Sequence, residues 1–171
     1  MLLSDGKSML GIEFIKTACA NYDFSEYRMK LLNKTILENI NSISLRKAKK
    51  LDRKEIARQN AIFIYGSEEC EDFPEEEEVI NEITYMVELE EVIIGKIKIE
   101  YDDNSAFVGG FGILPYFRGK GYGKAALIAA LRLINEENIN DVECKNNTAL
   151  NLYKACGFQE RSVMNYYKYN I

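Results

Sequence analysis

The sequence contains no histidine among its 171 residues. This absence excludes Ser-His and Cys-His nucleophilic catalysis, HExxH metal sites and a histidine general base. Any chemistry on this chain must therefore use carboxylates, tyrosine, lysine, cysteine, backbone amides or water.

Other features are scarce. Four cysteines, Cys19, Cys70, Cys144 and Cys156, are widely spaced without a CxxC pair, which favours reduced thiols over disulfides or a zinc site. No apolar run approaches the ~18 residues of a membrane span, and the first eleven residues lack the apolar stretch of a signal peptide. The net charge of -5 argues against a nucleic-acid partner. We therefore expect a cytoplasmic protein without metal, membrane or nucleic-acid contacts.

The composition, 47% hydrophobic and 29% charged, suits one soluble domain. Helical and alternating apolar patterns indicate its elements. From residue 42 onward their order predicts an α/β (α+β) fold, a mixed sheet with helices packed on it. The expected helices cover residues 9–22, 53–64, 121–135 and about 147–156, and the expected strands cover 24–31, 42–47, 83–89, 92–101, 106–114, 141–144 and 158–169.

Several residues refine this pattern. Asp52 is expected to cap the helix at 53–64, and Gly66 to close it. Asn146 or Asn147 is expected to cap the later helix, which Gly157 ends.

Two of the expected strands, at residues 92–101 and 106–114, have unusual residue patterns. Lys96, Lys98 and Glu100 alternate with apolar residues, as in a half-buried strand. Gly109, Gly110 and Gly112 share the next strand, which predicts a bulge or a close approach by another group.

The segment from Ile113 to Lys124, ILPYFRGKGYGK, joins a strand to a long helix. A helix N-terminus exposes unpaired N–H groups and partial positive charge, and glycines let an anion reach those amides. Arg118 and Lys120 add positive charge, as does Lys124. The spacing fits neither GxxxxGK[ST] nor GxGxxG. These features predict a phosphate site of another type.

Two motifs then make the pattern specific. The first is Ile113-x-Pro115 followed by Arg118-x-x-Gly121-x-Gly123, and the second is Asn146-x-x-Ala149-x-x-Leu152-Tyr153 followed by Gly157-Phe158. In this order and spacing they resemble the GNAT superfamily of GCN5-related N-acetyltransferases, over about residues 43–169. The resemblance implies a central mixed, mostly antiparallel sheet flanked by helices. It also implies a splayed strand pair at the cofactor cleft and acetyl-coenzyme A as cosubstrate.

The resemblance also implies roles for individual residues. Tyr153 would be the general acid for the departing thiolate, although a buried aromatic on the helix stripe is the alternative. Asn146 would lie on the cofactor side of the cleft. The backbone of Ile113 and Leu114 would pair with pantetheine, with an N–H near Ile113 polarising the thioester carbonyl. The pyrophosphate would be bound by the amides of Arg118, Gly119, Lys120, Gly121, Tyr122, Gly123 and Lys124.

The implied reaction is direct attack by a primary amine on acetyl-coenzyme A within a ternary complex. The alternative is a non-catalytic coenzyme A-binding sensor or scaffold. The general base stays open among Glu82, Glu88 and Glu100. The acidic run at residues 68–78 is either a solvated loop or a rim that attracts a cationic acceptor.

The chain divides into an extension at residues 1–41 and a GNAT domain at 42–171. The extension is either an unrelated addition or the remnant of a preceding GNAT domain in a tandem protein. A remnant cannot bury its own core and must dock on the complete domain or on a second subunit, which allows a homodimer. It predicts a helix and then a strand at residues 9–31, with Phe14, Ile15 and Ala18 buried.

Overall fold

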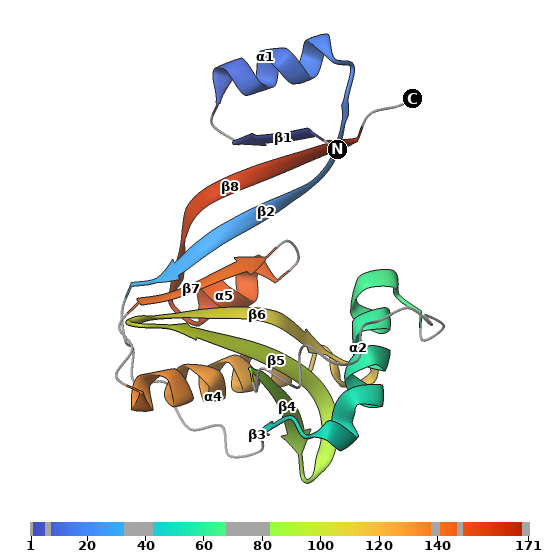
Figure 1. Cartoon of the computed structure of the whole chain (residues 1–171), viewed down its shortest axis with the longest axis vertical. Coiled ribbons are helices and arrows are strands. Elements are labelled where there is room, and N and C mark those ends of the chain that lie inside the picture. The colour runs from blue at the N-terminus through green and yellow to red at the C-terminus, as the bar shows by residue number, and fades with distance from the viewer. Residues whose placement is uncertain are drawn as a thin grey trace. The chain divides into compact units, whose positions relative to one another are not determined.

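The computed structural model describes residues 2–5, 8–32, 43–67, 83–137, 141–146 and 149–168. The chain forms two compact units (Figure 1). The terminal unit combines Met1–Thr35 with Asp141–Ile171, and the continuous unit is Ile36–Asn140. Within the described ranges, no helix is long and apolar enough to cross a membrane.

The continuous unit contains an antiparallel meander of four strands. In spatial order these are β3 (Ile43–Lys47), β4 (Thr84–Leu89), β5 (Val92–Asp102) and β6 (Ser105–Ile113). Glu90 and Glu91 both adopt positive φ, 50° and 69°, as the central residues of a tight hairpin turn that matches the twist of its strands. The expected strands are confirmed to within one or two residues.

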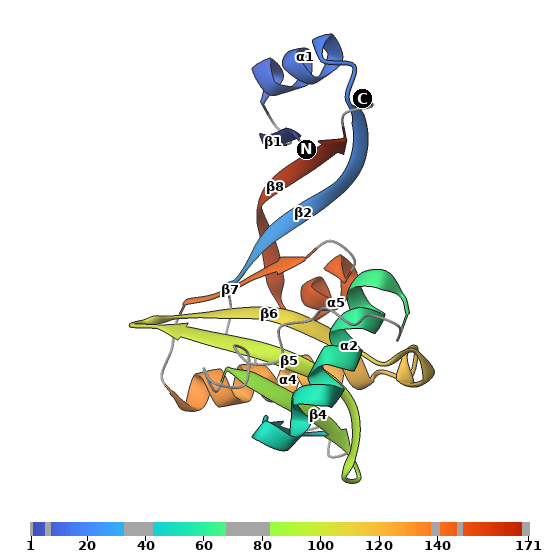
Figure 2. The same cartoon turned by 45° about the vertical axis from the view of Figure 1, so that its right-hand side comes forward.

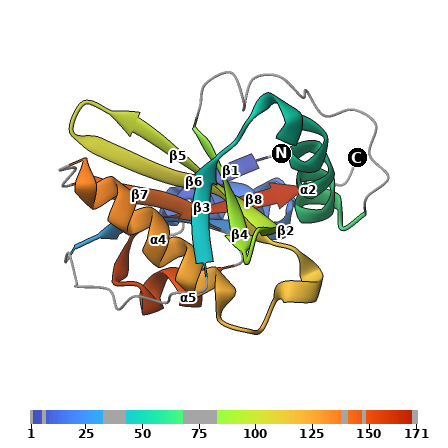
Figure 3. The same ribbon diagram turned by 90° about the horizontal axis from the view of Figure 1, so that it is seen from below.

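Helices pack on both faces of this meander. α2 (Arg53–Tyr65) contacts one face, where Ile56 packs on Met86. α4 (Tyr122–Glu136) packs against β3, β5 and β6 and buries Ala126, Leu127, Ala130 and Ile134 (Figure 3). Leu45 lines a small pocket together with residues of α4, so its side chain lies on the α4 side of the meander. Val87 is paired with Leu45 and therefore points to the same side, whereas the neighbouring Met86 points to the α2 side.

The prediction that Lys96 lies on a solvent-facing side of its strand is wrong, because this side chain is only 1% exposed. Lys96 lies opposite Met86 on one neighbouring strand and Gly112 on the other. Ile56 covers Met86, and the Phe63 ring lies where a side chain at Gly112 would point. From Ile56 to Phe63 a helix advances about 10 Å, which is also the span of three adjacent strands. α2 therefore runs along this cross-strand row and covers Lys96.

The boundaries of α2 follow the prediction, but Asp52 acts differently from the expected cap. Asp52 occupies the N-cap position, but its side chain accepts no hydrogen bond from a helix amide. It accepts instead from the Lys49 N–H at 2.6 Å and from Arg46 Nη1 at 2.8 Å, and the Arg46 hydrogen bond lowers the pKa of the Asp52 carboxyl. Gly66 closes the helix in the left-handed conformation, with φ 73°, as expected.

The terminal unit contributes the other four strands of the eight-stranded sheet, and these strands come from both ends of the chain. Their spatial order is β1 (Leu2–Asp5), β8 (Phe158–Lys168), β2 (Asn21–Leu31) and β7 (Asp141–Asn146). The long β2–β8 ribbon is plain in Figure 2. It carries a stacked pair, Phe24 on Tyr166, with ring centroids 4.4 Å apart. α1 (Met9–Thr17) precedes β2, and α5 (Leu150–Ala155) precedes β8.

The expected helix and then strand at residues 9–31 are confirmed. Ser8 caps α1 by accepting from the Gly11 N–H at 3.1 Å, and the helix ends before Cys19, whose φ is 50°. Ile15 is buried as predicted, but the prediction for Phe14 is wrong, since 61% of it is exposed.

Candidate functional site

The site begins with a bulge in β6. Between Lys96 and Lys98 of β5 the register of β6 shifts by one residue, so Gly110 and Phe111 together oppose Ile97. Gly110 has φ +49°, and a Cβ there would lie 2.7 Å from Cδ of Lys98. At Gly112 a Cβ would overlap the Phe63 ring. The predicted bulge and close approach are therefore both present.

The end of β6 directs one peptide group outward. Leu114 N donates to the Ile94 carbonyl at 2.8 Å, and Gly95 pairs with Ile113. In an antiparallel ladder, bonded and non-bonded pairs alternate, so the N–H and C=O of Ile113 point away from β5. The amide suited to polarise a thioester carbonyl is therefore that of Ile113, while the Leu114 amide is used within the sheet.

The connection from β6 to α4 contains two glycines whose backbone is not shielded by side chains. It contains a 3-10 turn at Pro115–Phe117, and Gly119 and Gly121 follow with φ +74° and +85°. A Cβ at either glycine would meet no heavy atom within 4 Å. Gly121 occupies the N-cap position of α4, no side chain caps the helix there, and its first turn has no acidic residue. Uncapped amides of this kind at a helix N-terminus suit an anion, and the phosphate site stays a prediction.

The basic residues of this loop differ in their surroundings. Arg118 Nε donates to the Ile113 carbonyl at 2.7 Å, and its guanidinium lies 6.0 Å from the centroid of the Phe63 ring. Lys120 Nζ lies 4.6 Å from the Tyr116 ring centroid, and Lys124 is exposed. Arg118 thus holds the loop against β6 and α2, whereas Lys120 and Lys124 are the cations suited to a phosphate. Phe63, which the sequence reasoning missed, connects Gly112 with Arg118.

Tyr153 lies on α5 and is 3% exposed. Its ring contacts Phe158 edge to face, with centroids 5.2 Å apart. Burial raises the pKa of the Tyr153 hydroxyl, and the nearby Cys144 and Cys156 raise it further, so the hydroxyl keeps its proton at neutral pH. The proton is available for donation, but the raised pKa makes the hydroxyl a weaker acid toward a thiolate, and a core tyrosine would have the same properties. The catalytic role stays a prediction.

The predicted cofactor residues Ile113 to Lys124 come together in the continuous unit, while Asn146 and Tyr153 belong to the terminal unit. Asn146 ends β7, opposite Tyr27. Asn147 lies outside the described residues, and α5 begins with Ala149 at the N-cap position and no side-chain cap. The expected cap by Asn146 is therefore wrong. Gly157 follows α5 with φ 91°, as expected.

Of the three candidate general bases, Glu88 is engaged elsewhere. Its Oε1 accepts from Arg46 Nε at 2.8 Å, so its charge already has a guanidinium partner. Glu100 is 54% exposed and lies 3.9 Å from Lys98 Nζ. Glu82 lies outside the described residues. The geometry therefore disfavours Glu88 and leaves the other two candidates open.

Known proteins resemble this chain in sequence and in architecture. The family model described as "Acetyltransferase (GNAT) family" matches residues 52–158. An uncharacterized N-acetyltransferase of Bacillus subtilis (strain 168), YycN, is 36% identical over 69 residues, 38% of this chain and 44% of that protein.

Solved structures extend the likeness. A GCN5-related N-acetyltransferase from Sphaerobacter thermophilus matches with a TM-score of 0.71 and 13% identity, over 96% of this chain and 58% of its own. The PaiA N-acetyltransferase from Thermoplasma acidophilum, solved in complex with coenzyme A, matches with a TM-score of 0.57 and 18% identity, over 74% of this chain and 99% of its own. The chain thus spans little more than half of the Sphaerobacter structure. The glycine loop, the bulged strand before it and the family model agree, and the chain belongs to the acetyltransferase (GNAT) family.

Proposed function

We propose that this chain transfers an acetyl group from acetyl-coenzyme A to a primary amine by direct attack within a ternary complex. The observation that carries the proposal is the loop from Ile113 to Gly121. It places an outward-directed amide next to uncapped, side-chain-free amides at the start of α4. Such a loop suits a ligand with a carbonyl at one end and a pyrophosphate at the other. Membership of the GNAT family supports acetyl-coenzyme A as that ligand.

In the proposed reaction, the amine nitrogen attacks the carbonyl carbon of the thioester. The Ile113 N–H stabilises the negative charge that develops on the carbonyl oxygen. The carbon–sulfur bond then breaks, and the thiolate takes a proton from the Tyr153 hydroxyl. The amine releases a proton, which passes through a water molecule to the carboxylate of Glu100 or Glu82. Solvent then restores the proton of Tyr153.

A covalent acetyl-cysteine route is less favourable than direct attack. Burial raises the pKa of the Cys144 thiol to about 12, and Glu143 adds to the shift. Only a thiolate is an effective nucleophile, so the raised pKa disfavours Cys144 as a nucleophile at neutral pH. Cys156 is also buried. These observations support a single transfer from thioester to amine.

The proposal specifies the acceptor only as a primary amine. A cationic acceptor stays part of the proposal because of the acidic run at residues 68–78, which lies outside the described residues. The buried position of Tyr153 favours a second candidate, a coenzyme A-binding module without catalysis.

Thiol release separates these two functions. We expect the protein to liberate free coenzyme A from acetyl-coenzyme A in the presence of at least one amine of a panel. The panel should cover polyamines, amino acids, aminoglycosides and peptides with free N-termini or lysines. Tight binding of coenzyme A without turnover on any amine would support the non-catalytic module.

We further propose that residues 1–41 are the remnant of a preceding GNAT domain, and that the acetyltransferase domain begins near residue 42. Support comes from the helix and then strand at residues 9–31. The likeness to the Sphaerobacter structure covers 96% of this chain, so it includes part of this segment. An unrelated extension is the alternative. Sequence comparison with full-length tandem GNAT proteins tests the proposal, because a remnant should align with the end of their first domain.

A further inference from the structure

The ring of Phe63 lies directly against the backbone at the end of β6. A Cβ at Gly112 would come within 2.6 Å of three atoms of this ring. Since a bond from Cα to carbon is about 1.5 Å long, these ring atoms lie about 4 Å from the Gly112 Cα, which is van der Waals contact. The ring therefore takes the place that a side chain of residue 112 would occupy on the α2 side of the sheet.

Two observations place the ring beside the outward-directed peptide group of Ile113. The Ile113 nitrogen is bonded to the carbonyl carbon of Gly112, so it lies one peptide bond from the backbone that the ring contacts. Arg118 donates to the Ile113 carbonyl at 2.7 Å, and its guanidinium lies 6.0 Å from the centroid of the Phe63 ring. Phe63 is only partly buried. Its ring thus borders the position where a ligand carbonyl would accept from the Ile113 N–H.

The other side of this peptide group is occupied as well. Gly95 pairs with Ile113 and lies on the α4 side, because the next residue, Lys96, lies on the α2 side. A Cβ at Gly95 would lie 3.0 Å from Cδ1 of Ile113, so the Ile113 side chain points to the α4 side, where it is buried. A group bound at the Ile113 N–H therefore meets the Ile113 side chain on one side and the Phe63 ring on the other.

The direction of the bound donor follows from the course of the loop. A thioester carbonyl carbon carries sulfur on one side and the acyl chain on the other. The sulfur leads through pantetheine to the pyrophosphate, whose proposed site at Gly121 lies further along the chain than Ile113. The acyl chain is then directed back along β6, toward Gly112 and the Phe63 ring. We propose that Phe63 closes the acyl pocket and restricts the donor to acetyl-coenzyme A. This proposal rests on the proposed function, because it requires the thioester carbonyl at the Ile113 N–H.

Calorimetric titration with coenzyme A and its thioesters tests the proposal without an amine, so no transfer occurs. The native chain should bind hexanoyl-coenzyme A about 5- to 150-fold more weakly than acetyl-coenzyme A, because added methylenes overpack the pocket. Phe63→Ala removes a ring with more carbons than hexanoyl adds to acetyl. Each buried methylene contributes about fourfold in affinity, so hexanoyl-coenzyme A should bind this variant at least ~10-fold more tightly than it binds the native chain. Phe63→Leu, a more conservative change, should shift the preference in the same direction by less.

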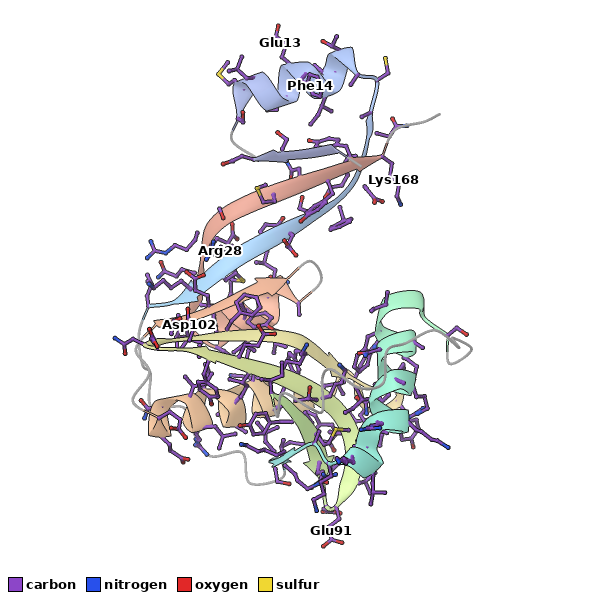
Figure 4. The ribbon with its side chains drawn as sticks, viewed as in Figure 1. Glu13, Phe14, Arg28, Glu91, Asp102 and Lys168 are labelled. Atoms are coloured by element: carbon purple, nitrogen blue, oxygen red, sulfur yellow. The ribbon has the colours of Figure 1, made fainter. Side chains whose placement is uncertain are left out.

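Phe107→Ala is the matched control. The Phe107 ring also lies against a glycine of β6, since a Cβ at Gly109 would lie 3.0 Å from it, and Phe107 is partly buried like Phe63. Phe107 is six residues before Ile113, about 20 Å along the strand. It lies near the turn of the β5–β6 hairpin, and Figure 4 shows Asp102, at the end of β5, on the side away from α2. Its replacement should leave the preference for acetyl at the native value.

The decisive quantity is the Kd of hexanoyl-coenzyme A divided by the Kd of coenzyme A. If Phe63 only holds Arg118 and the loop in place, Phe63→Ala weakens both ligands equally and leaves this ratio unchanged, which would overturn the proposal. A native chain that binds the acetyl and hexanoyl thioesters equally well would also overturn it. In both cases, tight binding of coenzyme A itself leaves the proposed donor site intact. A chain that binds none of these ligands would overturn the proposed function together with the role of Phe63.

Discussion

Replacing Gly121 by valine should separate ligand binding from folding, because the chain offers a matched glycine elsewhere. Gly121 has φ +85° and Gly66 has φ +73°, and a Cβ at either would meet no heavy atom within 4 Å. Valine therefore introduces the same backbone strain at both positions, about 1–2 kcal/mol. Gly121, however, begins α4, where the proposed pyrophosphate lies, whereas Gly66 ends α2.

The expected magnitudes follow from this difference. In a protein of this size each variant should lower Tm by about 2–8 °C. Only Gly121→Val should weaken the binding of coenzyme A, because the valine side chain fills the space between the ligand and the amides. Hydrogen bonds to charged groups contribute about 1.5–3 kcal/mol each, so the loss of one contact predicts a ten- to ~150-fold increase in Kd.

Calorimetric titration with coenzyme A measures this effect on protein shown by circular dichroism to be folded. Equal affinities of Gly121→Val and Gly66→Val would refute the assignment of the loop as the phosphate site. Arg118→Ala should weaken binding less than Gly121→Val, since Arg118 is bonded to the Ile113 carbonyl and faces Phe63.

Substitutions of Tyr153, Gly112 and Asp52 should each have a distinct effect. Tyr153→Phe should lower turnover ~10²–10⁴-fold while coenzyme A affinity and Tm stay near native. Loss of Tm with turnover per folded molecule preserved would support a core role instead. Gly112→Ala should lower stability by about 1–3 kcal/mol because of overlap with Phe63, and Phe63→Leu should relieve the loss in a thermal-melt double-mutant cycle. Because Arg46 lowers the pKa of Asp52 below its ordinary value of 3.8, this carboxylate stabilises the fold fully above that value. Its contribution disappears as pH falls through the lowered pKa, so urea unfolding of Asp52→Asn should depend less on pH between 5 and about 2.

The continuous unit was predictable because its signals are local. Alternating residues mark β5, acidic turns separate it from β4 and β6, and Gly66 ends its helix through a conformation that glycine adopts readily. The amides of the loop before α4 also follow from local glycines at a helix start. Burial of Lys96 was not predictable, because it results from the course of α2 over a row of three strands.

The terminal unit was less predictable, because its order depends on pairing between distant segments. The sequence indicates a strand near residues 24–31, but nothing local places β2 between β7 and β8. The end of α1 was equally hidden, since Cys19 adopts a positive φ without being glycine. For Tyr153 the stripe on α5 predicts burial, and burial alone does not distinguish a general acid from a core residue.

The position of β2 has a consequence for synthesis of the chain. Its partners on β8 are far away in sequence: Ser25 bonds Asn165 and Glu26 bonds Tyr166, each 140 residues apart. At translation rates of about 5–20 residues per second, β2 leaves the ribosome roughly 7–28 seconds before β8. During that interval the edge of β2 that pairs with β8 is open, and the strand carries Tyr22, Phe24 and Tyr27. Nascent chains stalled before residue 158 should therefore bind chaperones and be cleaved by protease near β2, whereas the continuous unit can already be folded.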